Sequence, residues 1–261
     1  MEATMVRVLL AGESWVSATI DHKGYDPFAH TRVQIGCARL LTALEAEGLD
    51  VVHLRSHDVA ERFPQTRDEL SGFDVVLLSD IGANSLLLHP DTFSLGRPTP
   101  NRLTLLRDWV HDGGGLMMAG GYLSFQGFEG KANYHRTAVE HVLPVDLSPY
   151  DDRVETPEGL RGDVVRTHAI TDGLDRRWPI LLGYQRAVAK PDATVLAEID
   201  GDPLLAIREV GAGRTLAFMS DVSPHWAPEE FMSWPGYGPL FASALRWLAG
   251  EPVESAAGPR D

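Results

Sequence analysis

Residues 116–121 read LMMAGG, and this stretch decides how the rest of the chain is interpreted. Its first four residues are all apolar, which is typical of a strand buried on both faces of a parallel sheet. The glycine pair that follows breaks the strand and begins a loop. Directly upstream, residues 103–110 carry apolar side chains at helical spacing, and three glycines at 113–115 end that pattern. The stretch therefore predicts a helix followed by a buried strand.

The same kind of unit recurs toward the N-terminus. Residues 6–11 form a short apolar run, and a polar loop is expected to follow it. A helical stripe comes next and ends at Gly48, and its members are Val33, Cys37, Leu40, Leu41 and Leu44. Two further strands are expected at residues 50–54 and 75–79. Alternation of strands and helices favours a parallel sheet covered by helices on both faces.

The C-terminal half has a different pattern. Residues 193–199, 204–210 and 214–219 are strand-like, and the last two runs are separated by a turn of hairpin length. An amphipathic helix around Leu240–Leu248 follows. We predict an α/β fold with a doubly wound, mostly parallel sheet and an antiparallel excursion in the C-terminal half. One domain is expected over residues 1–250, with a flexible tail at 251–261.

Composition excludes several classes of function. The chain has 261 residues and a formal net charge of −14, so binding to nucleic acid or to an anionic membrane is not expected. Its single cysteine, Cys37, excludes an intramolecular disulfide and a thiolate zinc site. No apolar stretch is long enough to cross a bilayer or to act as a signal peptide. We therefore expect a cytoplasmic protein.

Open α/β sheets bind ligands beyond the carboxyl ends of their strands. Four loops lie at such ends in this sequence, and all four are rich in polar and aromatic residues. The first loop contains GESW (12–15) and HKGYD (22–26). The other three contain DIGAN (80–84), GGYLSFQG (120–127) and SDVSPHW (220–226).

These loops resemble the class I glutamine amidotransferase-like superfamily, a flavodoxin-like group that includes the ThuA-like and DJ-1/PfpI proteins. The greatest similarity is to a branch described as putative glutamine amidotransferase, and it extends over residues 6–249. The resemblance implies a flavodoxin-like fold. It also implies a cysteine nucleophile at a strand-to-helix elbow and a histidine from a late strand.

The cysteine is missing from the expected place. Depending on the alignment, Tyr122 or Gly121 stands where the family has its nucleophile, and neither can hydrolyse glutamine. The histidine is retained as His225, although the family's His-Pro-Glu has become HWAPE. Cys37 belongs to the apolar helical stripe, so we expect it to be buried and unreactive.

The remaining candidates are polar and aromatic residues of the four loops. His225, Glu13 and Tyr122 are the candidate catalytic residues, because an imidazole and a buried carboxyl can exchange protons near neutrality. The candidate ligand-binding residues are Trp15, Lys23, Asp80, Asn84, Ser124, Gln126, Asp221 and Trp226. Structural roles, such as capping a turn or packing beneath a loop, are the alternative for each of them.

Two interpretations stay open. In the first, the protein binds a small polar molecule, either carbohydrate-like or an amide. It does not hydrolyse glutamine and catalyses another reaction, if any. The residues that would stack on a sugar are Trp15, Tyr25, Tyr122 and Trp226. In the second, it is a non-catalytic scaffold or interaction subunit with a degenerate site. Neither requires a cofactor or a metal, because the histidines have no tight ligand spacing. A homo-oligomer is compatible with both.

Overall fold

The computed structural model describes residues 5–251, so the predicted tail lies outside the described residues except for Glu251. The strands are β1 (Arg7–Gly12), β2 (Ser14–Lys23), β3 (Asp26–Ile35), β4 (Asp50–Leu54), β5 (Val75–Ser79), β6 (Gly115–Ala119), β7 (Val145–Asp146), β8 (Arg153–Val164), β9 (Arg177–Gln185), β10 (Val188–Ala189), β11 (Thr194–Ile199), β12 (Asp202–Val210) and β13 (Gly213–Phe218). The helices are α1 (Ala38–Ala46), α2 (Ser56–Arg62), α3 (Arg67–Leu70), α4 (Ala83–Leu87), α5 (Pro90–Leu95), α6 (Arg102–His111), α7 (Ala138–Val142), α8 (Glu229–Met232) and α9 (Tyr237–Leu248), with a 3₁₀ turn, η1, at Phe128–Gly130.

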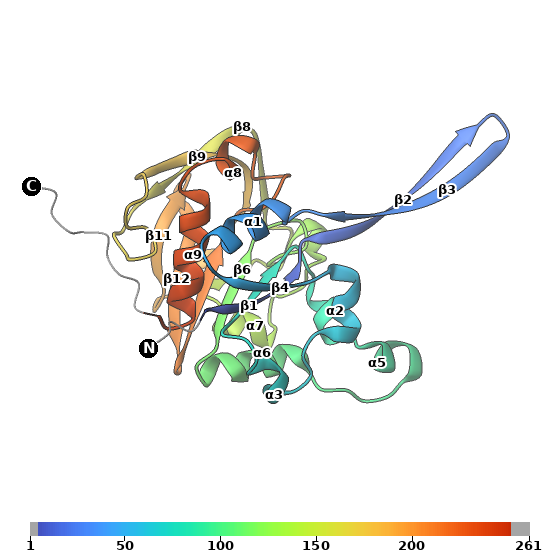
Figure 1. Ribbon diagram of the computed structural model, residues 1–261, viewed down its shortest axis with the longest axis horizontal. Helices are drawn as coiled ribbons and strands as arrows, with labels where there is room; N and C mark the ends of the chain where they lie inside the picture. The colour runs from blue at the N-terminus through green and yellow to red at the C-terminus, as the bar shows by residue number, and fades with distance from the viewer. Residues whose placement is uncertain (1–4, 252–261) are drawn as a thin grey trace, which may run out of the picture.

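A nine-stranded sheet runs through the centre of the molecule in the order β4-β1-β5-β6-β13-β12-β11-β8-β9 (Figure 1). The first five strands in this order are parallel to one another. The last four alternate in direction, beginning with β12, which is antiparallel to β13. The α/β class and the antiparallel excursion in the C-terminal half are therefore confirmed.

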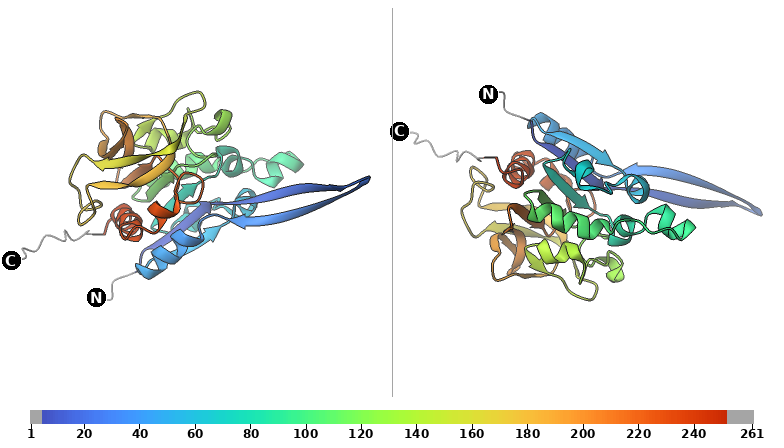
Figure 2. Two further views of the ribbon diagram at one scale, coloured as in Figure 1. Left: turned by 90° about the horizontal axis from the view of Figure 1, so that it is seen from above. Right: turned by 90° about the horizontal axis from the view of Figure 1, so that it is seen from below.

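Helices cover both faces of the sheet, as the two views of Figure 2 show. On one face α1, α8 and α9 pack against alternate strand residues, such as Leu10 and Met117. On the other face α2, α3, α4, α6 and α7 pack against the residues between them, such as Leu9 and Met118. Because β1, β5 and β6 are buried on both faces, their sequences are continuously apolar rather than alternating. Among residues 5–251, no helix combines the length and the apolar character that a membrane span requires.

The segment expected to be a polar loop after the first strand is instead a long antiparallel hairpin. Strands β2 and β3 pair over ten residues each and stand out from the body of the protein (Figure 1). Val33, which we expected on the first helix, lies on β3 with 49% of its surface exposed, and α1 begins only after Cys37. We call residues 14–35 the arm.

Strands β8 and β9 were also missed by the sequence analysis. Their burial patterns are irregular, and a register shift interrupts their pairing, so neither strand has a clean period of two. They extend the antiparallel half of the sheet to its edge and bring Arg153 and Gln185 toward the loops at the strand ends.

Candidate functional site

Four neighbouring parallel strands end in one row. Gly12 of β1 is in register with Ser79 of β5, Ser79 with Ala119 of β6, and Ala119 with Phe218 of β13. The chain that leaves each strand therefore enters the same region beyond the sheet. Three of these exits carry a carboxyl group, from Glu13, Asp80 and Asp221, and we call these three residues the carboxyl cluster.

Glu13 leaves β1 with a positive φ of 47°, and its backbone N–H donates to Ser79 O at 2.9 Å. This turn directs the side chain inward, where only 1% of the residue is exposed. The Ser79 hydroxyl donates to Oε1 at 2.6 Å, whereas Oε2 is buried without a hydrogen-bond partner in the described structure. Burial raises the pKa of Glu13 well above its usual range, and the charges of Asp221 and Asp80 raise it further.

Asp221 is 3% exposed and sits in a turn that it stabilises itself. Its Oδ1 accepts hydrogen bonds from the backbone N–H and the hydroxyl of Ser223, at 2.9 and 3.2 Å. Its Oδ2 lies 3.7 Å from His225 Nδ1. Burial raises the pKa of Asp221, and the nearby charge of Asp80 adds to that effect.

Asp80 also leaves its strand with a positive φ, here 46°. Its Oδ1 accepts from the Leu123 N–H at 2.7 Å, and its own N–H donates to Ser124 Oγ at 3.0 Å. Burial raises the pKa of Asp80, while hydrogen bonding to Leu123 and the positive charge of His225 oppose that rise. Asp80 therefore connects the loop after β5 to the loop after β6.

Burial disfavours ionisation of all three carboxyl groups, and the charge of Asp80 adds to this effect at Glu13 and Asp221. Asp221, with a pKa of about 8, therefore retains a proton near neutral pH. His225 beside them has the opposite tendency. Burial lowers the pKa of its imidazole, against the raising effect of Glu155, Asp80 and Glu13. A protonated carboxyl and a neutral imidazole at one site can donate and accept a proton respectively.

Tyr122 lies at the elbow after β6 with 38% of its surface exposed. The edge contact between its ring and His225 places the centroids 4.1 Å apart, and its ring stacks on Phe128 at 5.6 Å. The Arg153 guanidinium lies over both Tyr122 and Phe128, at 4.6 and 4.5 Å from the ring centroids. Tyr122 is thus a partly exposed aromatic surface beside His225.

The backbone of the elbow is held by Gln185 at the end of β9. Its amide Nε2 donates to Gly121 O, and its Oε1 accepts from the Gly121 N–H at 3.4 Å. A Cβ at Gly120 would come within 2.6 Å of Gln185 Oε1 and 2.7 Å of the Ser220 backbone. Glycine is therefore required at position 120 by close packing.

Cys37 is fully buried, as expected, although it precedes α1 rather than lying within it. Its Sγ lies 3.6 Å from His53 Nε2, and that nitrogen is 2.9 Å from Gly12 O. Burial raises the pKa of the thiol to about 12, and the charge of Glu13 contributes. A thiol in this state is a poor nucleophile at neutral pH.

The structure brings Glu13, Asp80, Asp221, His225 and Tyr122 to one region, but it places the other candidates differently. Lys23 and the aromatic Tyr25 lie at the tip of the arm, about 30 Å of strand from its base. Their expected position beside the other loops is therefore wrong, because the chain pairs with itself as a hairpin. Trp15 lies at the base of the arm, 38% exposed, and Asn84 is exposed on α4.

Three further candidates serve the protein's own packing. The indole of Trp226 is fully buried and donates to Glu155 Oε2 at 3.0 Å, so it cannot stack on a ligand as expected. Ser124 accepts from Asp80 N–H. Gln126 is 6% exposed, and its Oε1 accepts from the backbone N–H of His135 at 3.1 Å.

Sequence reasoning missed four residues that support this region: Ser79, Ser223, Arg153 and Gln185. Ser223 could have been found, because an aspartate followed two residues later by a serine is a common turn arrangement. Ser79 stands at the end of an apolar run and could also have been noticed. Arg153 and Gln185 could not, since they lie on the two strands that were not predicted.

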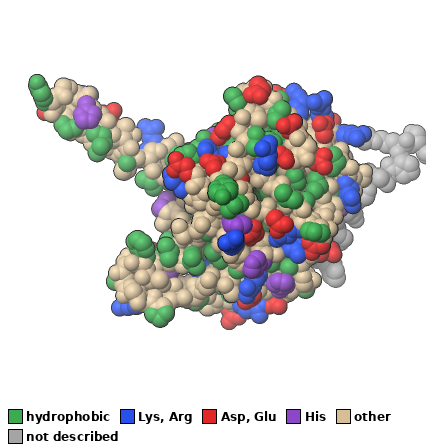
Figure 3. Space-filling view, turned by 180° about the vertical axis from the view of Figure 1, so that it is seen from behind, with side chains coloured by type: hydrophobic (Ala, Val, Ile, Leu, Met, Phe, Trp, Pro, Cys, Tyr) green, Lys and Arg blue, Asp and Glu red, His purple; other side chains and the backbone are tan. Residues whose placement is uncertain are grey.

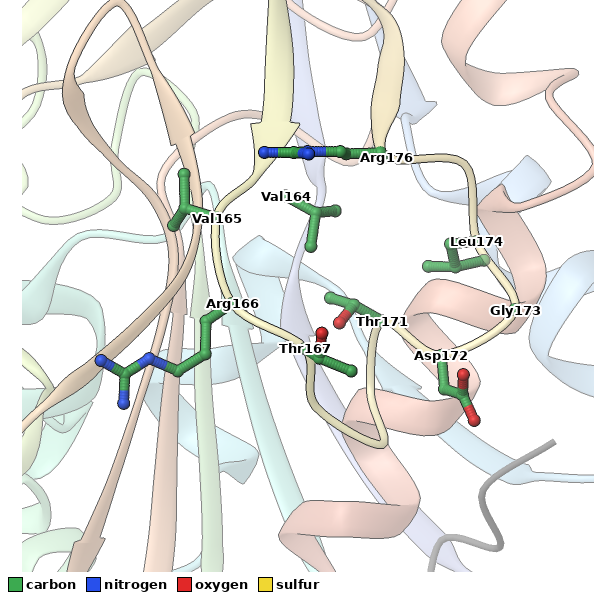
Figure 4. Close-up of a pocket in the computed structure, with 9 residues that line it drawn as sticks. All are labelled: Val164, Val165, Arg166, Thr167, Thr171, Asp172, Gly173, Leu174 and Arg176. Atoms are coloured by element: carbon green, nitrogen blue, oxygen red, sulfur yellow. The ribbon is translucent and has the colours of Figure 1, made fainter. Parts of the chain in front are cut away.

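The hollow in Figure 4, about 420 Å³, lies elsewhere, after β8. Its lining residues, 164–167, 171–174 and 176, include none of the candidates. Within residues 5–251 no group of three or more His, Cys, Asp or Glu side chains has a geometry that could hold a metal ion.

Comparison with known proteins agrees with this architecture. The family model described as putative glutamine amidotransferase matches residues 7–250. A cytoplasmic protein of Salmonella typhimurium is 44% identical, with a TM-score of 0.89, and the match covers 92% of this chain and 98% of that one. A second cytoplasmic protein, from S. typhimurium LT2, is 42% identical with a TM-score of 0.88, covering 93% and 99%.

A more distant structure is similar in fold alone. It is a putative ThuA-like protein from Parabacteroides merdae, 15% identical with a TM-score of 0.57, and the match covers 95% of this chain and 91% of that one. No curated protein matches the sequence.

Proposed function

We propose a function from one premise, that this chain belongs to the family described as putative glutamine amidotransferase. Within that family we propose that it binds a small, uncharged, hydroxyl-rich or amide-bearing molecule at the carboxyl cluster and does not hydrolyse glutamine. Its place of action is the cytoplasm, as for the two Salmonella proteins, and its ligand is neither nucleic acid nor membrane.

The observation that carries this proposal is the unpartnered Oε2 of Glu13. A buried carboxyl oxygen without a donor is costly, and such groups in native proteins call for an explanation. The hydroxyl of Ser223 is near enough to lower the pKa of Glu13, but the hydrogen bond that it donates goes to Asp221 Oδ1 at 3.2 Å. Because Oε1 accepts from Ser79, the proton that Glu13 retains lies on Oε2, and a ligand hydroxyl or amide carbonyl oxygen that accepts it would satisfy this atom.

The charges around the cluster favour an uncharged ligand. A buried anion would need a compensating cation, and Arg153, whose charge acts on His225, is already paired. Arg153 forms ion pairs with Asp151 at 2.9 Å and with Glu155 at 3.2 Å. Hydroxyl groups suit such a site, because carboxyl oxygens accept hydrogen bonds from them and the face of Tyr122 can pack on an apolar ring face.

The chemistry that this arrangement supports is proton transfer. A protonated Glu13 or Asp221 would act as the acid, and the neutral imidazole of His225 would act as the base. No thiol is available for the acyl transfer of a glutaminase, since residues 120–122 are Gly-Gly-Tyr and Cys37 is buried.

Ligand binding can be measured by the shift in melting temperature with a panel of neutral sugars, polyols, sugar acids and amides. We expect a neutral member to stabilise the protein. Glu13→Gln and Asp221→Asn should abolish that shift, whereas Glu158→Gln, which alters an exposed carboxyl on β8, should retain it. A shift with sugar acids only, or one that all three variants retain, would contradict the proposal.

Glutamine hydrolysis provides an independent test. We expect the purified protein to release no ammonia from glutamine above the buffer rate. Release that Cys37→Ser removes would mean that the buried thiol becomes exposed and reactive, and the proposal would then be wrong.

The competing function is a scaffold with a filled site, and the packing of Tyr122 against His225 and Phe128 favours it. It predicts no response to any member of the panel and lower melting temperatures for Glu13→Gln and His225→Ala. Each lost hydrogen bond with a buried partner would cost about 1–3 kcal/mol.

A further inference from the structure

The two faces of the arm have opposite chemistry. Residues that lie directly opposite in an antiparallel ladder share a face, so the register of β2 and β3 assigns every side chain. One face is mostly apolar, and its pairs are Ser14 with Ile35, Val16 with Val33, Ala18 with Thr31, Ile20 with Ala29, and His22 with Pro27. The other face is polar, and its pairs are Trp15 with Gln34, Ser17 with Arg32, Thr19 with His30, Asp21 with Phe28, and Lys23 with Asp26.

The polar face is satisfied within the arm. The imidazole of His30 lies 3.2 Å from Asp21, and the amide of Gln34 donates to Ser17 Oγ at 2.6 Å. Lys23 lies over the ring of Phe28 at 5.5 Å. These contacts connect the two strands, and Phe28 and Trp15 are the large apolar side chains that remain exposed on this face.

The apolar face is left in solvent. Ile20 is 64% exposed, Val16 51% and Val33 49%. Hydrophobic side chains are visible along the arm where it stands away from the body (Figure 3). A two-stranded hairpin is marginally stable in water unless its hydrophobic face is packed against something. A partner that packs on this apolar face would therefore stabilise the arm.

Charge indicates what covers it. The whole chain carries a net charge of −14, but the arm has two acidic and two basic residues and so no formal net charge. Two arms can therefore approach without repulsion between them. An anionic lipid surface would repel the body as the arm approached it.

The size of the apolar face determines how far the contact must extend. Two strands of ten residues present a flat face of roughly 300 Å², whereas a stable interface needs about 800 Å² on each partner. The contact must therefore extend beyond the arm. In a two-fold pair with antiparallel arms, each tip reaches the base of the partner's arm, and contact continues onto the body at both ends.

We propose that the apolar face of the arm binds the same face of a second copy of this chain, with the two arms antiparallel. The two-fold axis passes near the small Ala18–Thr31 pair, which lets the strands approach closely at the midpoint. His22 and Pro27 near each tip then face Ser14 and Ile35 at the base of the partner's arm, next to its Glu13. This proposal does not rest on the ligand proposed above.

Light scattering after size exclusion tests the partner. We expect the wild-type protein to have twice the single-chain mass of 28.6 kDa. Ile20→Glu should give the single-chain mass with an unchanged circular dichroism spectrum, because Ile20 contributes nothing to the body. Thr19→Glu adds the same charge to the polar face of the arm and should remain a dimer. A monomeric wild type, or dimers that survive Ile20→Glu, would overturn the proposal.

Cross-linking tests the antiparallel arrangement of the two arms. Cys37 is buried, so the wild-type protein should not react with the cross-linker. Packed sheets lie about 10 Å apart, so a bismaleimide of about that span should join two copies of Ala18→Cys. Thr19→Cys, on the opposite face, and Tyr25→Cys, at the tip, should not join. Efficient joining of Tyr25→Cys would mean parallel arms. Binding of a monomeric wild type to anionic vesicles would assign the face to lipid instead, and either result would overturn the proposal.

Discussion

The strand-end carboxyl groups of the body are buried, whereas the valine and isoleucine side chains of the arm are exposed. Glu13 is 1% exposed and Ile20 is 64% exposed. A carboxyl group is thus buried and a large apolar side chain faces solvent, and both placements are unfavourable. The two regions adjoin in the chain, because the arm begins immediately after Glu13. In both places folding alone gives no reason for the arrangement. Both therefore indicate a missing partner, a polar one for the body and an apolar one for the arm.

The comparison can be tested most strongly at two glycines, one in each region. Gly12 has a φ of 115°, and a Cβ there would lie 1.8 Å from Ser79 O. Because the clash is with backbone, Gly12→Ala should lower the free energy of unfolding by about 3 kcal/mol or more, at the upper end of overpacking effects. Urea denaturation would measure it. A loss below about 1 kcal/mol would mean that the strand ends can shift, and the rigid description of the carboxyl cluster would fail.

A second effect, spread over several pH units, is expected from the pH dependence of the carboxyl cluster. Between the pKa of an unfolded aspartate, about 4, and the raised value for Asp221, about 8, the folded chain keeps a proton that the unfolded chain has lost. Stability should therefore fall as pH rises through this range, by up to about 1.4 kcal/mol per pH unit for each retained proton.

Asp221→Asn removes this titration and retains an oxygen that can accept from Ser223. The variant should gain stability relative to the wild type as pH rises from 5 to 8, and the difference between the two unfolding curves is the measurement. Glu158→Gln should run parallel to the wild type. Parallel curves for Asp221→Asn as well would show that the carboxyl group is ionised throughout, contrary to the burial argument.

The smallest effect is expected at the tip of the arm. Gly24 has a φ of 65°, but a Cβ there meets nothing within 4 Å. Gly24→Ala should cost only the left-handed backbone strain, about 1 kcal/mol, which corresponds to roughly 2–4 °C in melting temperature. A loss as large as that of Gly12→Ala would show that the tip is packed and would remove the contrast between arm and body.

The parallel half of the sheet could be predicted from the sequence because its strands are buried on both faces. Residues 50–54 and 75–79 were predicted with the bounds that the structure has. The resemblance to the amidotransferase-like family was also correct. The strands that were missed could not be predicted because they depend on pairing between distant parts of the chain. Residues 14–35, for example, contain few consecutive apolar residues, so their sequence does not indicate a strand, although they form a long hairpin.

The candidate site could be predicted in part for the same reason. Glu13, Asp80 and His225 follow strands that were recognised, so the rule for strand ends located them. Lys23 was misplaced because a loop and a hairpin that leave the same strand end cannot be distinguished without knowing the pairing. Trp226 was misjudged because its partner, Glu155, lies on β8, which the sequence did not reveal.

The arm leaves and re-enters the body at one point, since Gly36 N–H donates to Glu13 O at 2.9 Å. It is an insertion whose two ends already meet, and its length is therefore independent of the body's geometry. Removing two residues from each strand would shorten the reach by about 7 Å and keep every side chain on its own face. Removing one from each would exchange the two faces beyond the cut. The span between two subunits can thus be adjusted in fixed steps without moving Glu13.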